Sequence, residues 1–140
     1  MAYNNIATVF QEIGDIKAAI DNYKKAIQLN QNFFEAYNNL GMLYESQGLK
    51  EDAINNISRS LKINSDYLLA YQNLGASLKD HNFSNENNDL EKIIEIFLKK
   101  NIVRPRNIEK ATISLLHNNK NIKQIFEKNL YGNLKKNFDQ

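Results

Sequence analysis

The stretch YNNLG at residues 37–41 decides the fold, because it recurs along the chain at a fixed interval. It returns as YQNLG at residues 71–75 and as YNNIA at residues 3–7, each copy displaced by 34 residues. Positions around it share the displacement, in the sets Phe10, Tyr44 and Leu78; Gly14 and Gly48; Ala19 and Ala53; Tyr23 and Ile57; Leu29 and Ile63. A period of this length predicts a row of similar stacked units.

Each unit is predicted to be a pair of helices. Apolar residues are spaced three and four apart, as in Leu40, Leu43 and Tyr44, which is the period of an amphipathic helix. Gly48 follows this first helix, where a glycine supplies the left-handed conformation that ends a helix and lets the chain reverse. The sequence therefore predicts an all-α fold of antiparallel helix hairpins.

Small residues occupy fixed places in each predicted hairpin. Gly41 and Ala53 allow two helix backbones to approach closely, while Tyr44 and Tyr23 fill the space beside such contacts. A Gly41→Leu substitution is therefore expected to overpack the hairpin.

This arrangement of aromatic, Leu-Gly, turn-glycine and small sites resembles the tetratricopeptide repeat (TPR) family. The resemblance implies a right-handed superhelical array of antiparallel helix hairpins, a TPR-like α-solenoid of three to four helix pairs. Residues 1–66 are predicted to form two units, residues 67–101 a third, stretched unit, and residues 102–140 diverged capping helices. The proline that follows the second helix in the family is absent here, where Gln31 and Ser65 stand, so a less sharply fixed exit is predicted.

Composition limits the functional classes. The chain of 140 residues has 42% hydrophobic and 24% charged residues and no cysteine, which excludes disulfides and thiolate chemistry. Its apolar runs are far shorter than the roughly 20 residues of a membrane span, and no signal peptide is evident. We therefore expect a cytoplasmic protein that does not bind a membrane.

Catalytic and metal-binding patterns are weak. His81 falls in a polar connection, His117 near the end of a short predicted helix, and their spacing does not suit a shared metal. Glu91 and Glu95 have a spacing typical of a solvated helix face. The glycines lie in no phosphate-binding or nucleophile motif. We predict no enzyme, no catalytic residue, no metal site and no cofactor.

The C-terminal region is basic. Residues 101–140 hold eight Lys or Arg against three Asp or Glu, including the group Lys120, Lys123, Lys128, Lys135 and Lys136. Lysines without interleaved exposed aromatic residues support only unspecific phosphate contact. A solvated tail, or contact with an acidic region of a neighbouring repeat, is the favoured interpretation, and no specific nucleic acid is expected as a partner.

The resemblance implies where a partner would bind, since in this family the first helices of successive pairs line a concave groove that receives an extended peptide or a helix. Helical position places these peptide-binding candidates in the groove: Asn5, Thr8, Glu12, Glu35, Asn38, Asn39, Met42, Glu45, Gln72, Asn73 and Lys79. The adjacent positions Asn4, Gln11, Leu69 and Ala76 face the same way by the same reasoning.

Asn5, Asn39 and Asn73 place one amide per unit in register. An amide both donates and accepts, so such a ladder would hold a peptide backbone without requiring a particular sequence. The ladder is similar to that in the repeat region of O-GlcNAc transferases, which carry a like Tyr-Asn-Asn-Leu-Gly string. The alternative is compositional, because 23 of the 140 residues are asparagine.

The sequence therefore predicts a protein–protein interaction module whose partner is another polypeptide. A second hypothesis makes the chain the substrate-recruiting part of a larger enzyme, such as a glycosyl- or sulfotransferase. A third is self-association through the first helix pair, which has no predicted cap before Met1-Ala2-Tyr3.

Overall fold

The computed structural model describes residues 1–79, 88–100 and 112, and within them it contains six α-helices and no strand. The helices are α1 (Ala2–Glu12), α2 (Ile16–Leu29), α3 (Phe34–Ser46), α4 (Lys50–Ile63), α5 (Leu68–Leu78) and α6 (Asn88–Lys100). The chain divides into two compact units, Met1–Ser77 and Leu78–Gln140. The predicted all-α fold is confirmed.

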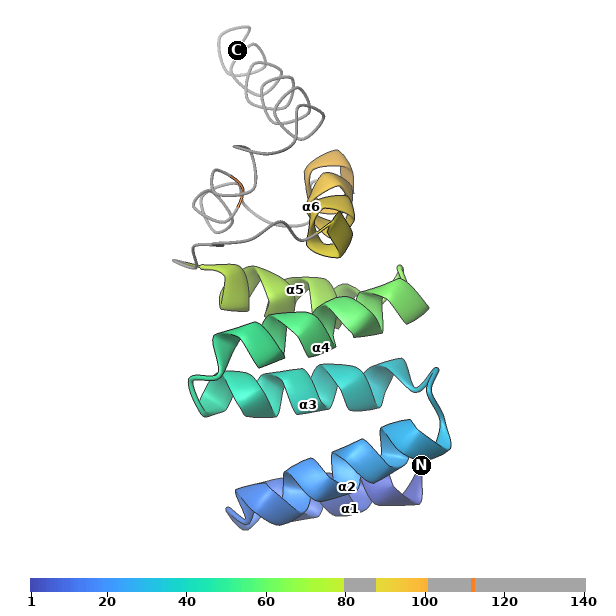
Figure 1. Ribbon diagram of the computed structural model, residues 1–140, viewed down its shortest axis with the longest axis vertical. Coiled ribbons are helices and arrows are strands. Elements are labelled where there is room, and N and C mark those ends of the chain that lie inside the picture. Colours follow the sequence, from blue (N-terminus) through green and yellow to red (C-terminus); the bar gives the residue numbers. More distant parts are fainter. Residues whose placement is uncertain (80–87, 101–111, 113–140) are drawn as a thin grey trace, which may run out of the picture. The chain divides into compact units, whose positions relative to one another are not determined.

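In the first unit the helices follow one another as a stack of antiparallel hairpins (Figure 1). Helix α1 packs against α2, α3 packs against α4, and α2 also contacts α3. The second helix of one hairpin thus covers the first helix of the next. Ala7, Ala19, Tyr23, Leu40 and Leu43 form a buried cluster across this junction.

The tight hairpin turns follow from two glycines. Gly14 and Gly48 have φ angles of +83° and +75°, a left-handed conformation that costs free energy for residues with a Cβ atom. In the first turn, Gly14 N–H donates to Gln11 O and Asp15 N–H to Phe10 O, the paired bonds that close a helix end at a glycine. Asp15 then caps α2 by accepting from Ala18 N–H at 3.0 Å.

Close helix packing in the second hairpin depends on Gly41. A Cβ atom at this position would lie 2.6 Å from Ile57 Cγ1 and 3.0 Å from Ala53 O. Ile57 and Ala53 are themselves fully buried, so neither has space to move away. The predicted role of Gly41 and Ala53, which is to bring the backbones of α3 and α4 together, is therefore confirmed.

Asparagine side chains shape the exits of α2 and α4, where the family proline is missing. Asn30, which ends α2, accepts from Asn32 N–H at 3.0 Å, and Asn64, which ends α4, accepts from Asp66 N–H at 3.1 Å. Such Asx turns replace a backbone turn and fix the direction of the chain. The exits are therefore defined by asparagine where the sequence predicted a looser connection.

The second unit is described only in part. Helix α6 buries Ile93, Ile94 and Phe97, in agreement with the apolar face that the periodicity predicts. Both α5 and α6 fall within the range 67–101 that was predicted as the third repeat. The capping helices predicted for residues 102–140, like His81, His117 and the lysine group, lie outside the described residues, so these assignments stay predictions.

Candidate functional site

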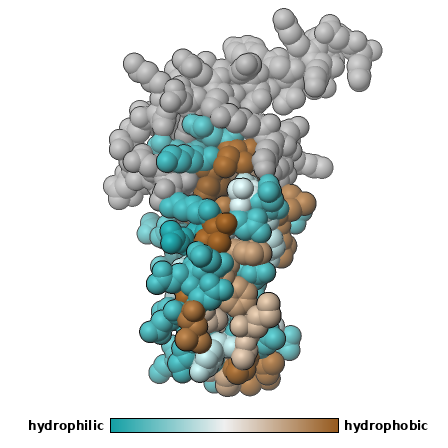
Figure 2. Space-filling view, turned by 90° about the vertical axis from the view of Figure 1, so that its right-hand side faces the viewer, coloured by the Kyte–Doolittle hydropathy of each residue, from teal (hydrophilic) through white to brown (hydrophobic). Residues whose placement is uncertain are grey.

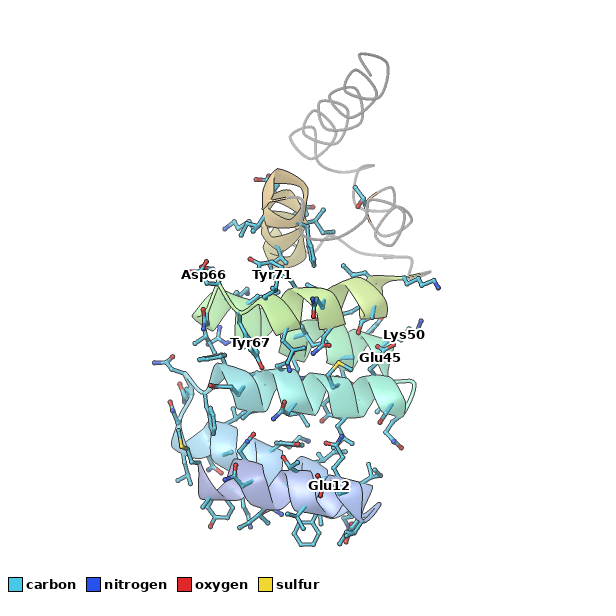
Figure 3. All side chains as sticks on the ribbon, turned by 180° about the vertical axis from the view of Figure 1, so that it is seen from behind. Glu12, Glu45, Lys50, Asp66, Tyr67 and Tyr71 are labelled. Atoms are coloured by element: carbon cyan, nitrogen blue, oxygen red, sulfur yellow. The ribbon has the colours of Figure 1, made fainter. Side chains whose placement is uncertain are left out.

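The predicted binding residues lie on α1, α3 and α5, except Lys79, which directly follows α5. Figure 3 views the first unit from the side on which α1 and α5 are nearer than α2 and α4. Asn5, Glu12, Gln72 and Lys79 are exposed, while Thr8, Glu35, Asn39, Met42, Glu45 and Asn73 are partly buried. Asn38 alone among the predicted residues is fully buried, at 1% exposure.

Amide pairs link successive first helices. Asn39 Nδ2 donates to Asn4 Oδ1 at 3.3 Å, and Asn73 Nδ2 donates to Asn38 Oδ1 at 2.9 Å. Each pair joins residues 35 apart, one more than the repeat period, because the second asparagine of one unit reaches the first asparagine of the unit before it. Two of the three predicted ladder residues therefore also connect neighbouring repeats.

These bonds decide which amide atoms remain for a partner. Within the described residues, Asn39 Oδ1 and Asn73 Oδ1 make no hydrogen bond, and each Nδ2 keeps one further N–H. Asn5 holds the same register position in the first hairpin, and its side chain has no hydrogen-bond partner in the described part. Asn38 is occupied by its bond to Asn73 and belongs to the interior, which corrects its predicted place in the groove.

A pocket of about 170 Å³ opens between the first and second hairpins. Thr8 and Gln11 line it from α1, Tyr23 from α2, and Asn39 and Met42 from α3. The sequence placed Thr8, Gln11, Asn39 and Met42 on this side of the molecule, and the structure brings them together. Tyr23 was predicted only as a residue that fills space between helices.

The Tyr23 hydroxyl joins a short polar network at this pocket. It donates to Gln11 Oε1 at 3.1 Å and lies 3.2 Å from Thr8 Oγ1, which also contacts the carbonyl of Asn4 at 3.1 Å. Tyr23 is only 1% exposed, so its ring is part of the core while its hydroxyl reaches the pocket. The one signal in the sequence was that Tyr23 corresponds to Ile57, which has no polar atom on its side chain.

Acidic groups lie further along the same side. Glu45, labelled in Figure 3, is partly buried, and its Oε2 is buried without a hydrogen bond in the described structure. A carboxylate oxygen in that situation favours a donor from another molecule. Glu35 raises the pKa of Tyr67 above its ordinary value as a secondary cause, after partial burial of the phenol.

The described residues offer little for other chemistry. Among residues 1–79, 88–100 and 112, no three His, Cys, Asp or Glu side chains come together as a metal site would require. In the same residues, every helix is too short or too polar to cross a bilayer. The organised features of the site are thus its amide pairs, its polar pocket and its carboxylates.

Comparison with known proteins agrees with this architecture. Residues 7–48 match the family described as TPR repeat, and residues 34–67 match the family described as tetratricopeptide repeat. Among curated protein sequences, none matches.

Solved structures extend the likeness over most of the chain. Two crystal structures of MamA each cover 96% of this chain, at 24% sequence identity and TM-scores of 0.54 and 0.53. The chain spans 58% and 55% of the length of those two structures. At this identity the likeness concerns the fold, which is an all-helical TPR-type solenoid. Residues 7–67 of the chain are therefore similar to tetratricopeptide repeats.

Proposed function

We propose that the first helices α1, α3 and α5 form a groove that binds an extended segment of another polypeptide. Helical repeats of this class build extended surfaces for partner recognition. The observation that carries the proposal is the in-register placement of Asn39 and Asn73, each held by a hydrogen bond to the preceding repeat.

The internal amide bonds favour binding because they fix the side chains in advance. Asn39 and Asn73 each use one N–H internally, so their Oδ1 atoms and remaining N–H groups are held in place without a partner. A group that is already ordered loses less conformational entropy on binding. The free Oδ1 atoms would accept hydrogen bonds from the backbone N–H groups of the bound segment.

Charge on the same side suggests which partner sequences are preferred. Glu12, Glu35 and Glu45 are the acidic candidates, on α1 and α3, whereas Lys79, directly after α5, is the basic candidate. The unpaired Oε2 of Glu45 favours a lysine, an arginine or an N–H donor beside it. We therefore expect segments with a basic residue near the middle of the groove to bind more tightly than acidic segments.

A peptide array followed by fluorescence anisotropy tests the groove directly. The triple variant Asn5→Ala, Asn39→Ala and Asn73→Ala is expected to bind array-selected peptides at least about tenfold more weakly, because three amides are lost. Asn55→Ala, an exposed asparagine on α4, is the matched control and should bind normally. Circular dichroism must show the triple variant folded, and unchanged affinity in that folded protein would exclude the amide groove.

A second proposal concerns self-association through α1. Ile6 and Val9 are 42% and 56% exposed, whereas Leu40 and Leu43, their counterparts one repeat later, are 3% and 1% exposed beneath α2. Figure 2 shows hydrophobic residues at the surface of this end of the stack. Since Glu12 is the single charged residue of α1, two copies of this helix face can meet without opposed like charges.

We infer that a second copy of the chain covers this face weakly, with α1 packed against α1. Sedimentation at increasing concentration should show dimers, and Ile6→Glu with Val9→Glu should abolish them. Gln28→Glu, at an exposed position of α2, adds charge elsewhere and should leave the dimer intact. A strict monomer at high concentration would contradict this proposal and leave the groove unaffected.

The likeness of YNNLG to the repeats of O-GlcNAc transferases suggests a third role. In that role the repeats recruit the substrate of a larger cytoplasmic enzyme, such as a glycosyl- or sulfotransferase. Reading the genomic sequence on both sides of the chain distinguishes this role from an independent interaction module, because a transferase domain would be encoded in the same reading frame.

A further inference from the structure

The pocket lined by Thr8, Gln11, Tyr23, Asn39 and Met42 has a chemistry more selective than backbone recognition. We propose that it is a side-chain subsite of the groove and that it takes an asparagine or glutamine of the bound segment. This inference rests on the proposed function, because it assumes that a polypeptide lies across α1 and α3.

The size of the pocket limits its occupant to one side chain. Its volume of about 170 Å³ lies below the roughly 300–1,000 Å³ of pockets that hold whole small molecules. Its walls come from three helices, α1, α2 and α3, so the walls are set by the packing of the first two hairpins. A single inserted residue is the occupant that fits this space.

The lining excludes charged occupants. Its polar groups are two hydroxyls and two amides, and the fifth residue, Met42, is apolar. A carboxylate or an ammonium group entering the pocket would give up hydration without meeting an opposite charge. Asp, Glu, Lys and Arg are therefore disfavoured at this position of the partner.

The hydrogen-bond inventory favours a primary amide among neutral side chains. Thr8 and Tyr23 have one hydroxyl proton each, and three contacts share these two protons: with the Asn4 carbonyl, with Gln11 Oε1 and between the two hydroxyls. The hydroxyl oxygens therefore keep lone pairs that can accept a hydrogen bond from an occupant. Asn39 Oδ1 also accepts nothing in the described structure. Donors come from Gln11, whose Oε1 accepts from Tyr23, while both protons of its Nε2 make no hydrogen bond within the described residues.

An occupant that matches these groups must donate and accept at once. The carboxamide of Asn or Gln does both with one flat group, whereas Ser or Thr has a single proton and Leu or Val has no polar atom. Met42 provides apolar contact for the methylene stem. The next repeat offers different chemistry, since Met42, Glu45 and Ile57 correspond there to Thr8, Gln11 and Tyr23. The amide preference is therefore expected at one position of the partner.

The test is a positional scan of a peptide that the full chain selects from an immobilised random-sequence library. At one position, Asn or Gln should bind about tenfold more tightly than Asp, Lys or Leu, as two or three added hydrogen bonds predict. Gln11→Glu should shift the preference at that position toward Lys. Gln28→Glu, the same change at an exposed site on α2, should leave the preference as it was.

The outcomes separate this inference from the function on which it rests. Peptide binding with no amide preference at any position, or with a preference that Gln11→Glu leaves unchanged, overturns the subsite while the groove stands. If no peptide binds the chain, the groove and the subsite both fail. Tyr23→Phe provides a second variant, expected to weaken the amide preference while its ring still fills the core.

Discussion

Asn73 and Asn38 show how a single side-chain bond joins two repeats. Asn38 is 1% exposed, and its Oδ1 accepts from Asn73 Nδ2 at 2.9 Å. Removing a donor from a buried acceptor costs more than the bond itself contributes, because the acceptor is left unpaired. The pair therefore makes the fit between α5 and the second hairpin sensitive to one residue.

Asn73→Ala is expected to lower the free energy of unfolding by about 1–3 kcal/mol, since it leaves Asn38 Oδ1 buried and unpaired. Urea denaturation measures the change. Asn5→Ala is the matched control, because Asn5 has the same register position but is exposed and unpaired in the described structure. That control should stay within about 0.5 kcal/mol of the natural chain. Equal effects from both substitutions would show that the amide pair contributes nothing to stacking.

Gly41→Ala sets two effects against each other. Alanine gains about 1 kcal/mol of helix propensity over glycine, but overpacking a filled core costs about 1–3 kcal/mol. Because the new Cβ would lie 2.6 Å from Ile57 Cγ1 and 3.0 Å from a backbone oxygen, we expect overpacking to win by about 1 kcal/mol.

A double-mutant cycle isolates this contact. In an Ile57→Ala background the clashing Cγ1 is gone, so Gly41→Ala should cost less there than in the natural chain. Denaturant midpoints of the four proteins give the comparison. The same cost in both backgrounds would mean that Ile57 moves aside freely and that the glycine is not needed for close approach.

For individual residues, the sequence predicted the positions that require a small side chain but did not predict the hydrogen bonds between asparagine side chains. Gly41 and Ala53 were found because a small residue recurs in register. The amide pairs were missed because they join residues 35 apart, off the 34-residue period, and depend on side-chain orientation. Asn38 and Asn39 are adjacent in sequence, yet one is buried and the other faces the pocket.

Helices α3 and α5 begin beside each other, and an aromatic contact marks the place. The rings of Phe34, at the start of α3, and Tyr67, just before α5, meet edge to face with centroids 4.9 Å apart. Burial of the Tyr67 phenol, helped by the negative charge of Glu35, raises its pKa above the ordinary value of 10.0. Ionisation of the Tyr67 phenol therefore costs more free energy in the folded chain than in the unfolded chain.

The sign of the pH effect follows from the direction of that shift. Below a pH of about 10 the phenol is neutral in both the folded and the unfolded chain, so its stabilising contribution is complete. As the pH rises further, the unfolded chain loses the proton first and the free energy of unfolding falls. Phenylalanine has no ionisable proton, so the free energy of unfolding of Tyr67→Phe should not fall in this way. Any stability advantage of the natural chain over the variant should therefore shrink or reverse above about pH 10. Urea titrations across that range measure it, and a constant difference would contradict the shifted pKa.

Helix boundaries were largely predictable, since Gly14 and Gly48 mark the turns and the apolar period marks the helices. The path of the chain after α2 and after α4 was less predictable. An absent proline suggested loose connections, but Asn30 and Asn64 provide Asx turns in its place. Asparagine is so frequent in this chain that its turn-forming copies do not stand out from the rest.

In the whole molecule, the proposed function arises from repetition of the helix hairpin. Stacked hairpins bring α1, α3 and α5 to one side, and the amide pairs hold that side in register. The same side carries the polar pocket and the partly buried Glu45. The sequence period predicted that the first helices share a side. It did not predict the pocket, because the pocket depends on the hydroxyl of Tyr23, which extends from α2.

The most direct test is nuclear magnetic resonance of the side-chain amides while an array-selected peptide is added. If the peptide lies along α1, α3 and α5, the NH₂ signals of Asn39, Asn73 and Gln11 will shift in proportion to binding, while those of Asn55 and Gln28 on the second helices stay in place. Shifts confined to α2 and α4, with the amides of α1, α3 and α5 unchanged, would contradict it.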